Sequence, residues 1–315
     1  MREMGRVVDL YVFSGFLGSG KTTLLKKMLE HYYDKNIGVV VNEFGKEGFD
    51  GKRVNRNGVE MVEINNGSVF CSCLKGSFVD ALISLAERDL DYLFVEGSGL
   101  SDPSNMDELL FILEKKLGSN PYAYRGSICI IDGVNFYDYF DLFVAIEKQV
   151  KSADSLIINK LDLMEKKEVE DLKEELKIMN PKANILTTSY CNIDFRQFEK
   201  MIRQEEPMEK SETVNTPEDR PRTYVLRTSY ELEKEKLEKF LRAMSQDIVR
   251  IKGTVILQEG TYQLDVVGTQ IDFMKMDHEE NESKLVIIPR FGREVIRKIF
   301  HQWEKALPNV KMRLK

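Results

Sequence analysis

Cysteine is scarce in this sequence, with four residues among 315. That number is too small for a disulfide-stabilised scaffold, so we expect free thiols and a reducing compartment. Long apolar runs are also missing, since no stretch approaches the roughly 20 residues that cross a bilayer. The first residues, MREMGRVVDLYVFSG, lack the pattern of a secretory signal. These absences predict a cytoplasmic protein without a membrane partner.

An excess of positive charge is absent as well. The chain has 46 lysine and arginine residues against 52 aspartate and glutamate residues, for a formal net charge of -6. Non-specific binding of nucleic acid needs a basic surface, so we expect no nucleic-acid partner. Hydrophobic residues make up 42% and charged residues 31% of the chain, which is the mix of a globular protein with one large or two ordinary domains.

Up to residue 203, apolar strand-like runs alternate with amphipathic helix-like runs such as KTTLLKKMLEHYY and VEDLKEELKIM. Several of the strand-like runs are apolar almost throughout, which is typical of parallel strands covered on both faces. The alternation predicts a doubly wound α/β domain with a mostly parallel sheet over residues 1–203. The predicted strands are 7–14, 37–42, 59–64, 91–96, 127–132, 154–159 and 183–188.

The polar, proline-containing segment 204–221 interrupts this pattern, and we interpret it as a linker. Residues 222–315 then follow the order βαβββα. The expected strands there are TYVLRTS, IVRIKGTVILQ, TYQLDVVGTQIDFMKM and SKLVIIP. This order predicts a smaller α+β domain with its helices on one face of a sheet.

The strongest functional signal is GFLGSGKT at residues 15–22, which fits the phosphate-loop pattern G-x-x-x-x-G-K-[ST]. A predicted strand leads into it and a predicted helix leads out, so backbone N–H groups can surround phosphates beside a helix N-terminus. Lys21 is expected to offset the charge of the γ-phosphate during catalysis, and the Thr22 hydroxyl to bind Mg²⁺. The predicted nucleotide-binding residues of this segment are Gly15, Gly18, Ser19, Gly20, Lys21, Thr22 and Thr23.

A second motif, Asn159-Lys160-Leu161-Asp162, ends a later strand and has the form N-K-x-D. A carboxylate at this point can accept hydrogen bonds from both the ring N–H and the exocyclic amine of guanine, whereas adenine lacks that donor pair. Ser189, in TTSY after the next strand, is expected beside the base. The motif therefore predicts GTP and GDP as the nucleotides.

Two further loops carry acids suited to the phosphate end of the nucleotide. In YLFVEGSGLSDP, Glu96 ends a buried strand, where we expect it to hold the Mg²⁺ shell or to orient the attacking water. Gly99 in the same loop is expected to bring a backbone N–H to the γ-phosphate. In VVVNEFGKEGFD, Glu43 and Asp50 are both candidates to approach Mg²⁺, and the sequence does not choose between them.

In their order along the chain, SGFLGSGKTTLL, VNEFG, the cysteine-containing loop after Asn66-Gly67, EGSGLSDP and NKLD resemble the CobW-type GTPases. These are relatives of the urease and hydrogenase maturation GTPases, within the SIMIBI class. The resemblance implies a GTP-driven metallochaperone or metalloenzyme activator that hydrolyses GTP slowly and serves a client metalloenzyme or cofactor protein. Nucleotide-gated dimers are common in this class, so a nucleotide-dependent homodimer is a further expectation.

Cys71 and Cys73 lie one residue apart in NNGSVFCSCLKGSF. The family pattern is C-x-C-C directly after Asn-Gly, and those three places here hold Ser68, Phe70 and Cys71. Two thiolates at this spacing can bind one metal ion such as Zn²⁺ or Co²⁺ if the chain turns, and Glu43 is the candidate for a third ligand. The alternatives are a strained disulfide and a pair of packed, unreactive side chains. An incomplete set of ligands suits a carrier that must release its metal.

The metallochaperone hypothesis couples the two sites. GTP and Mg²⁺ would order the Glu43–Asp50 loop and bring the thiolates into binding geometry, and hydrolysis would release the metal. One alternative is a GTP-dependent guardian or activator of a corrinoid or other cofactor protein, with no metal of its own. A P-loop metabolite kinase is a third class, but NKLD argues against it, as does the presence of only Arg125 as an arginine between residues 97 and 127.

Overall fold

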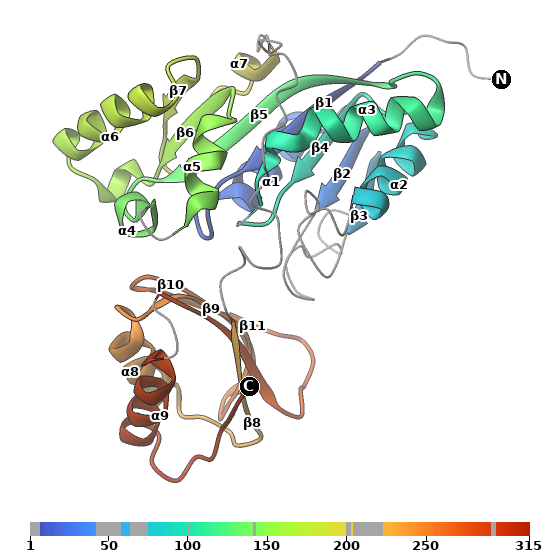
Figure 1. Cartoon of the computed structure of the whole chain (residues 1–315). Helices are drawn as coiled ribbons and strands as arrows, with labels where there is room; N and C mark the ends of the chain where they lie inside the picture. The colour runs from blue at the N-terminus through green and yellow to red at the C-terminus, as the bar shows by residue number, and fades with distance from the viewer. Residues whose placement is uncertain are drawn as a thin grey trace. The chain divides into compact units, whose positions relative to one another are not determined.

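The structure is a computed structural model that describes residues 7–41, 58–63, 75–99, 101–140, 143–199, 203, 223–290 and 294–315. Contacts divide the chain into two compact units, Met1–Asp219 and Arg220–Lys315 (Figure 1). The predicted linker, 204–221, lies outside the described residues. Its bounds, and those of the two predicted domains, therefore stay predictions.

The first unit contains a seven-stranded sheet in the order β3-β2-β4-β1-β5-β6-β7, and all of its strand pairs are parallel. This confirms the predicted α/β fold with a parallel sheet. The strands are β1 Val8–Ser14, β2 Ile37–Val41, β3 Val59–Glu63, β4 Tyr92–Glu96, β5 Tyr122–Asp132, β6 Ser155–Asn159 and β7 Asn184–Thr187.

Strand β5 begins five residues earlier than the predicted 127–132. The residues Tyr122–Gly126 carry no apolar period, and Gly126 has a positive φ of 132°. They are nevertheless part of the strand because they pair with β1, and the register shifts between Leu10 and Tyr11 to accommodate them. Pairing with a neighbouring strand extends β5 where the local pattern does not.

Helices follow the strands of the first unit, as its alternating pattern predicts. They are α1 Lys21–His31, α2 Lys75–Ala86, α3 Met106–Leu117, α4 Phe136–Phe140, α5 Val144–Lys151, α6 Lys166–Met179 and α7 Arg196–Glu199, with single turns η2 Pro103–Asn105 and η3 Leu161–Leu163. No helix among the described residues is long and apolar enough to cross a membrane.

Two hydrophobic cores lie on opposite faces of this sheet, because successive side chains of a strand point in opposite directions. Leu10 and Val12 of β1 pack with residues of α2 and α3. Tyr11 and Phe13, which alternate with them, pack with residues of α1 and α7. Burial on both faces explains why the strands read as nearly continuous apolar runs.

The second unit contains a six-stranded antiparallel sheet in the order β11-β10-β9-β12-β8-β13, with α8 and α9 beside it (Figure 1). Its elements are β8 Tyr224–Thr228, α8 Lys234–Met244, β9 Ile248–Leu257, β10 Gly260–Val267, β11 Gln270–Lys275, β12 Ser283–Pro289, α9 Glu294–Ala306 and β13 Arg313–Leu314. One core contains residues of both helices and of the sheet, which confirms the expected α+β layout.

The sequence pattern missed one turn in this unit. The run TYQLDVVGTQIDFMKM, expected as one strand, forms the two strands of a hairpin, β10 and β11. Gly268 between them has a φ of 58°, so it turns the chain, and Val267 pairs with Gln270 across the turn. The apolar alternation continues on both sides of the turn, so the periodicity of the sequence alone does not indicate where the turn lies.

Gly253, in β9, generates a stability prediction for the second unit. It pairs with both β10 and β12, and a Cβ built on it would lie 1.9 Å from the backbone oxygen of Lys284. We expect Gly253→Ala to lower the free energy of unfolding by about 2 kcal/mol or more, since the backbone of a neighbouring strand must move. Urea denaturation of the variant would measure this change.

Gly260→Ala is the matched control for this substitution. Gly253 and Gly260 both have a positive φ, of 155° and 121°, but the nearest neighbour of a Cβ on Gly260 would be the flexible end of Lys275 at 3.6 Å. The Gly260→Ala variant has the backbone strain but not the steric clash, so its free energy of unfolding should fall by less than that of Gly253→Ala. Equal loss in the two variants would show that strain alone, rather than the close approach of β12, decides the effect.

Candidate nucleotide site

The loop GFLGSGKT connects the end of β1 to the start of α1, in the strand–loop–helix order that the motif requires. Gly20 is the N-cap of α1 and has a φ of 114°. A Cβ on Gly20 would lie 2.6 Å from Nδ2 of Asn159, so a larger residue would push the loop away from β6. Ser19 is buried, Gly18 is half-buried and Thr23 is exposed on the first turn of the helix.

Lys21 curls back over the phosphate loop. Its Nζ donates hydrogen bonds to the backbone oxygens of Gly15, at 2.9 Å, and Phe16, at 3.1 Å. The side chain is only 8% exposed, so its positive charge is concentrated at the loop and the helix N-terminus. Both features favour an anion, because the N-terminal end of a helix carries partial positive charge.

Thr22 and Glu96 meet beside this loop. The Thr22 Oγ1 donates a 2.7 Å hydrogen bond to Oε1 of Glu96, which ends β4 and is 5% exposed. Strand β4 lies between β1 and β2, so its last residue lies next to the phosphate loop. A hydroxyl and a carboxylate oxygen are the ligand types that Mg²⁺ prefers, so these residues fit a magnesium site.

Gly99 brings the loop after β4 into contact with the phosphate loop. A Cβ on Gly99 would lie 2.4 Å from Cδ2 and 2.8 Å from the backbone nitrogen of Leu17. Only glycine permits this approach without a shift of one loop or the other. The structure thus places Gly99 against the phosphate loop.

Asn159, the last residue of β6, connects two loops. Its Nδ2 donates to the backbone oxygen of Ser19 at 2.9 Å, and its Oδ1 accepts a 3.1 Å hydrogen bond from the backbone N–H of Cys191. The side chain is buried, so both hydrogen bonds are shielded from water. The amide therefore holds the phosphate loop and the loop after β7 together.

Lys160 adopts a left-handed conformation, with a φ of 68°, and its Nζ forms a 2.8 Å ion pair with Oδ2 of Asp132. Asp132 ends β5 and its side chain is only 2% exposed. The same carboxylate accepts hydrogen bonds from the backbone of Val134 and Asn135. Asp132 was not predicted from the sequence, although an acid at the end of an apolar strand is a signal that could have indicated it.

Asp162 and Ser189 lie together. The backbone N–H of Asp162 donates a 3.0 Å hydrogen bond to Oγ of Ser189, and the Asp162 side chain lies on the exposed surface. The backbone of Leu161 also bonds to that of Thr188, at 3.2 Å. With the bond between Asn159 and Cys191, three hydrogen bonds join the NKLD segment to the loop after β7, and the Asp162 carboxylate is left facing outward.

Four predicted ligands of Mg²⁺ or of a second metal ion lie in parts of the chain that the structure does not describe. They are Glu43, Asp50, Cys71 and Cys73. Within the described part of the chain, no three His, Cys, Asp or Glu side chains group in a way that suits a metal ion. The predicted cysteine site is therefore an expectation that the described residues do not address.

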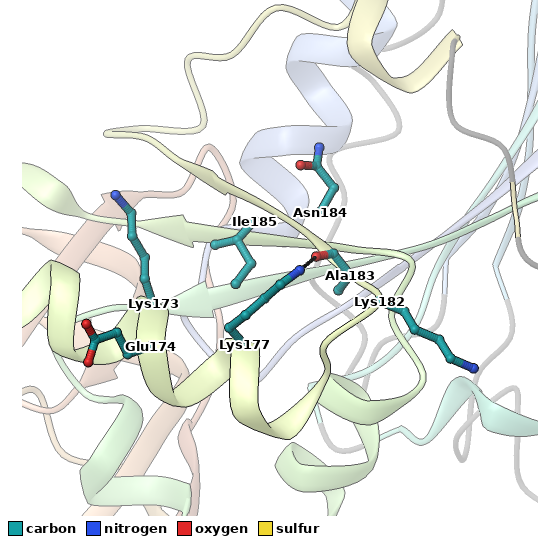
Figure 2. A pocket seen from close by; sticks show the side chains of 7 residues that line it. All are labelled: Lys173, Glu174, Lys177, Lys182, Ala183, Asn184 and Ile185. Atoms are coloured by element: carbon teal, nitrogen blue, oxygen red, sulfur yellow. Dashed lines mark hydrogen bonds between the residues drawn. The ribbon is translucent and has the colours of Figure 1, made fainter.

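A surface pocket of about 530 Å³ lies away from these loops, between α6 and the start of β7 (Figure 2). Its lining residues are Lys173, Glu174, Lys177, Lys182, Ala183, Asn184 and Ile185. Lys177 Nζ donates a 3.2 Å hydrogen bond to the backbone oxygen of Ala183. Strand β7 is the last strand of the sheet, so the pocket lies at one of its edges.

A parallel sheet with a phosphate loop after its first strand and N-K-x-D after its sixth defines a phosphate-loop nucleotide-binding protein. The family model "CobW/HypB/UreG, nucleotide-binding domain" matches residues 9–187. The model "Cobalamin synthesis protein cobW C-terminal domain" matches residues 222–304. The chain belongs to the CobW/HypB/UreG family.

Three curated relatives are similar to the first part of the chain. The zinc chaperone YjiA of Escherichia coli is 30% identical over 193 residues, covering 59% of each chain. The zinc-regulated GTPase metalloprotein activator 1 of Saccharomyces cerevisiae is 31% identical over 212 residues, covering 59% of this chain and 49% of the relative. The zinc chaperone CobW of Sinorhizobium is 27% identical over 195 residues, covering 52% and 54%. The match thus spans about half the length of these relatives.

Among solved structures, the Zn(II)-bound YjiA GTPase from E. coli has a TM-score of 0.48 to this chain at 22% sequence identity. That likeness covers 95% of this chain and 99% of the other.

The two described cysteines generate a prediction about reactivity. Burial raises the pKa of Cys129 to about 12 and that of Cys191 to about 11, and both are 1% exposed or less. Because the thiolate is the nucleophile, both should stay unreactive in native protein at pH 8. In a Cys71→Ser/Cys73→Ser variant, a maleimide should react at least about 100-fold more slowly before than after unfolding.

Fast labelling of either thiol in that folded variant would contradict the assignment of Cys129 and Cys191 as buried. The expected result leaves Cys71 and Cys73 as the source of any fast reaction in the unsubstituted protein.

Proposed function

We propose that this protein binds GTP and GDP with Mg²⁺, hydrolyses GTP slowly, and uses the nucleotide state to bind and deliver a metal ion to a client protein. The observation that carries the proposal is that two groups of residues meet at one edge of the sheet. One is the phosphate loop with the Thr22–Glu96 pair, and the other is the Asp162–Ser189 pair. Asn159 joins the two groups. Membership of the CobW/HypB/UreG family supports the nucleotide part of the proposal.

In this proposal the phosphate loop holds the β- and γ-phosphates, and Lys21 balances their charge. The loop glycines, Ser19 and Thr23 would supply backbone N–H groups, and Thr22 with Glu96 would hold Mg²⁺. When bound, Mg²⁺ would neutralise charge that develops on the phosphates. Glu96 would orient the attacking water. Slow turnover is expected because neither GFLGSGKT, EGSGLSDP nor NKLD contains an arginine or a glutamine.

At the other end, the Asp162 carboxylate would recognise guanine. Two observations support this role. The carboxylate faces outward beside Ser189, and the ion pair of Lys160 with Asp132 fixes the side chain of Lys160 nearby. Adenine would leave the carboxylate facing an acceptor, which is a strong basis for discrimination. Asn159 would act by holding the loops in place, since both ends of its amide are used within the protein.

Substitution of Asp162 tests the proposed base. Asp162→Asn should weaken GTP binding at least about 100-fold and should improve binding of xanthosine triphosphate, whose exocyclic oxygen on C2 replaces the guanine amine and can accept from the new amide. Isothermal titration with GDP, GTP analogue and xanthosine nucleotides would measure the change.

Asp171→Asn, an exposed aspartate of α6, is the matched control because it removes the same charge away from the site. An Asp162→Asn variant that keeps its preference for GTP would remove the basis for guanine recognition by this motif.

The metal part of the proposal is supported by relatives whose names describe zinc chaperones and a zinc-regulated GTPase. Its candidate ligands are Cys71, Cys73 and Glu43. Zn²⁺ or Co²⁺ is the proposed cargo, since both bind thiolates and carboxylates. A client metalloenzyme or cofactor protein would receive it, and a homodimer formed with GTP and a cytoplasmic location are further parts of the proposal.

An anaerobic titration with Zn²⁺ and Co²⁺ against a chromophoric chelator tests this part. The nucleotide-free, Mg-GDP and Mg-GTP-analogue forms would each be titrated. We expect tighter binding in the GTP-analogue form, sulfur-to-cobalt absorption bands, and an affinity that falls as pH falls because the thiols must lose their protons.

The Cys71→Ser/Cys73→Ser variant should lose the tight binding, whereas Cys129→Ala, which removes a buried thiol of β5, should keep it. If no form binds metal more tightly than the double variant, the carrier hypothesis fails. The alternative, a GTP-dependent guardian of a corrinoid or other cofactor protein, would then account better for the nucleotide site.

A further inference from the structure

A buried glutamine holds the loop that follows β4. Gln149 of α5 is 0% exposed, and its Nε2 donates hydrogen bonds to the backbone oxygens of Ser101, at 2.7 Å, and Gly99, at 3.3 Å. One side-chain amide thus binds two carbonyl groups of the same short turn. A helix far along the sequence thereby determines the position of this turn.

The orientation of the amide follows from its surroundings. With Nε2 on the two carbonyl groups, Oε1 is buried and has no hydrogen-bond partner among the described residues. Rotating the amide by half a turn would place Oε1 against two carbonyl oxygens, which is repulsive and leaves more groups unsatisfied. The donor therefore faces the turn.

The turn is tied to the rest of the site at two more points and closed by a hydrogen bond of its own. The backbone N–H of Gly97 donates to the backbone oxygen of Phe13 of β1 at 2.9 Å, and within the turn Ser101 Oγ donates to the backbone oxygen of Ser98 at 2.6 Å. Gly99 lies against Leu17 of the phosphate loop with no room for a Cβ. The turn is consequently held between the phosphate loop on one side and Gln149 on the other.

Helix α5 is itself fixed to the phosphate loop. Phe16 of that loop packs on Tyr139 of α4, with ring centroids 4.8 Å apart, and on Phe143, at 5.0 Å, directly before α5. Phe16 and Gln149 also line the same small cavity of about 10 Å³. The phosphate loop, α5 and the turn therefore form one packed group around the Gln149 amide.

We infer that Gln149 is the positioning residue that sets the turn after β4 at the γ-phosphate, so that the distinction between GTP and GDP depends on it. This inference rests on the proposed function. Gln149 does not touch the nucleotide and acts through Gly99 and Ser101. GDP lacks the phosphate that the turn would meet, so loss of Gln149 should weaken binding of GTP much more than binding of GDP.

Gln149→Leu tests the inference because leucine fills a similar volume without a donor. We expect the ratio of GTP-analogue affinity to GDP affinity to fall about tenfold, the effect of losing one to two hydrogen bonds. Single-turnover hydrolysis should slow as well, while GDP affinity stays near that of the unsubstituted protein. Gln197→Leu, an exposed glutamine of α7, is the matched control.

Gln149→Glu adds a readout that a packing role would not change. The protonated acid can donate to one carbonyl, whereas the carboxylate would repel both. Burial disfavours the anion and raises the pKa of such a group, so the affinity ratio should recover as pH falls from 8 to 6. Asp132, Cys129 and Tyr139 face the same region, and Asp102 follows Ser101, so each value is divided by that of unsubstituted protein at the same pH.

The outcomes separate this inference from the proposed function. Unsubstituted protein that binds neither GTP analogue nor GDP overturns both. If it binds them and Gln149→Leu keeps the same affinity ratio, or loses GTP and GDP equally, Gln149 is only a packing residue and the inference is wrong. Should the leucine variant fail to fold, the pH dependence of Gln149→Glu decides, and a flat ratio overturns the inference.

Discussion

The parallel register of the seven-stranded sheet is the constraint on which the site depends. Parallel strands end at one edge, so the loops after β1, β4, β6 and β7 converge although they are far apart in the sequence. Glu96 and Asn159 are the last residues of β4 and β6. The phosphate loop begins directly after β1, and Ser189 lies in the loop directly after β7. The apolar character of those strands is therefore as necessary for the site as the polar residues that follow them.

Much of this arrangement could be predicted from local sequence. GFLGSGKT and NKLD specify their own loop geometry and need only a strand before them, so their place at the sheet edge followed from the alternating pattern. The same pattern gave the strand β6 and its end at Asn159 correctly. Where local chemistry determines local conformation, the sequence alone was enough.

The rest could not be predicted because it depends on contacts between distant segments. Nothing near Asp132 indicates that Lys160, 28 residues later, forms an ion pair with it. Gln149 reads as one polar residue on an amphipathic helix, and its role follows only from the carbonyl groups of Gly99 and Ser101 that meet it in the fold. The extension of β5 and the hairpin β10–β11 show the same limit for secondary structure.

The two hydrogen bonds of Asn159 have a consequence for how a nucleotide is held. One amide joins the phosphate loop to the loop after β7, which the proposed function places beside the base, so the positions of the two loops are coupled. Ordering of one loop by a bound group lowers the entropic cost of ordering the other, and the two halves of a nucleotide are thermodynamically linked. Under the proposed function, base and phosphates are therefore bound as one ligand, with an affinity greater than separate binding of the two fragments would give.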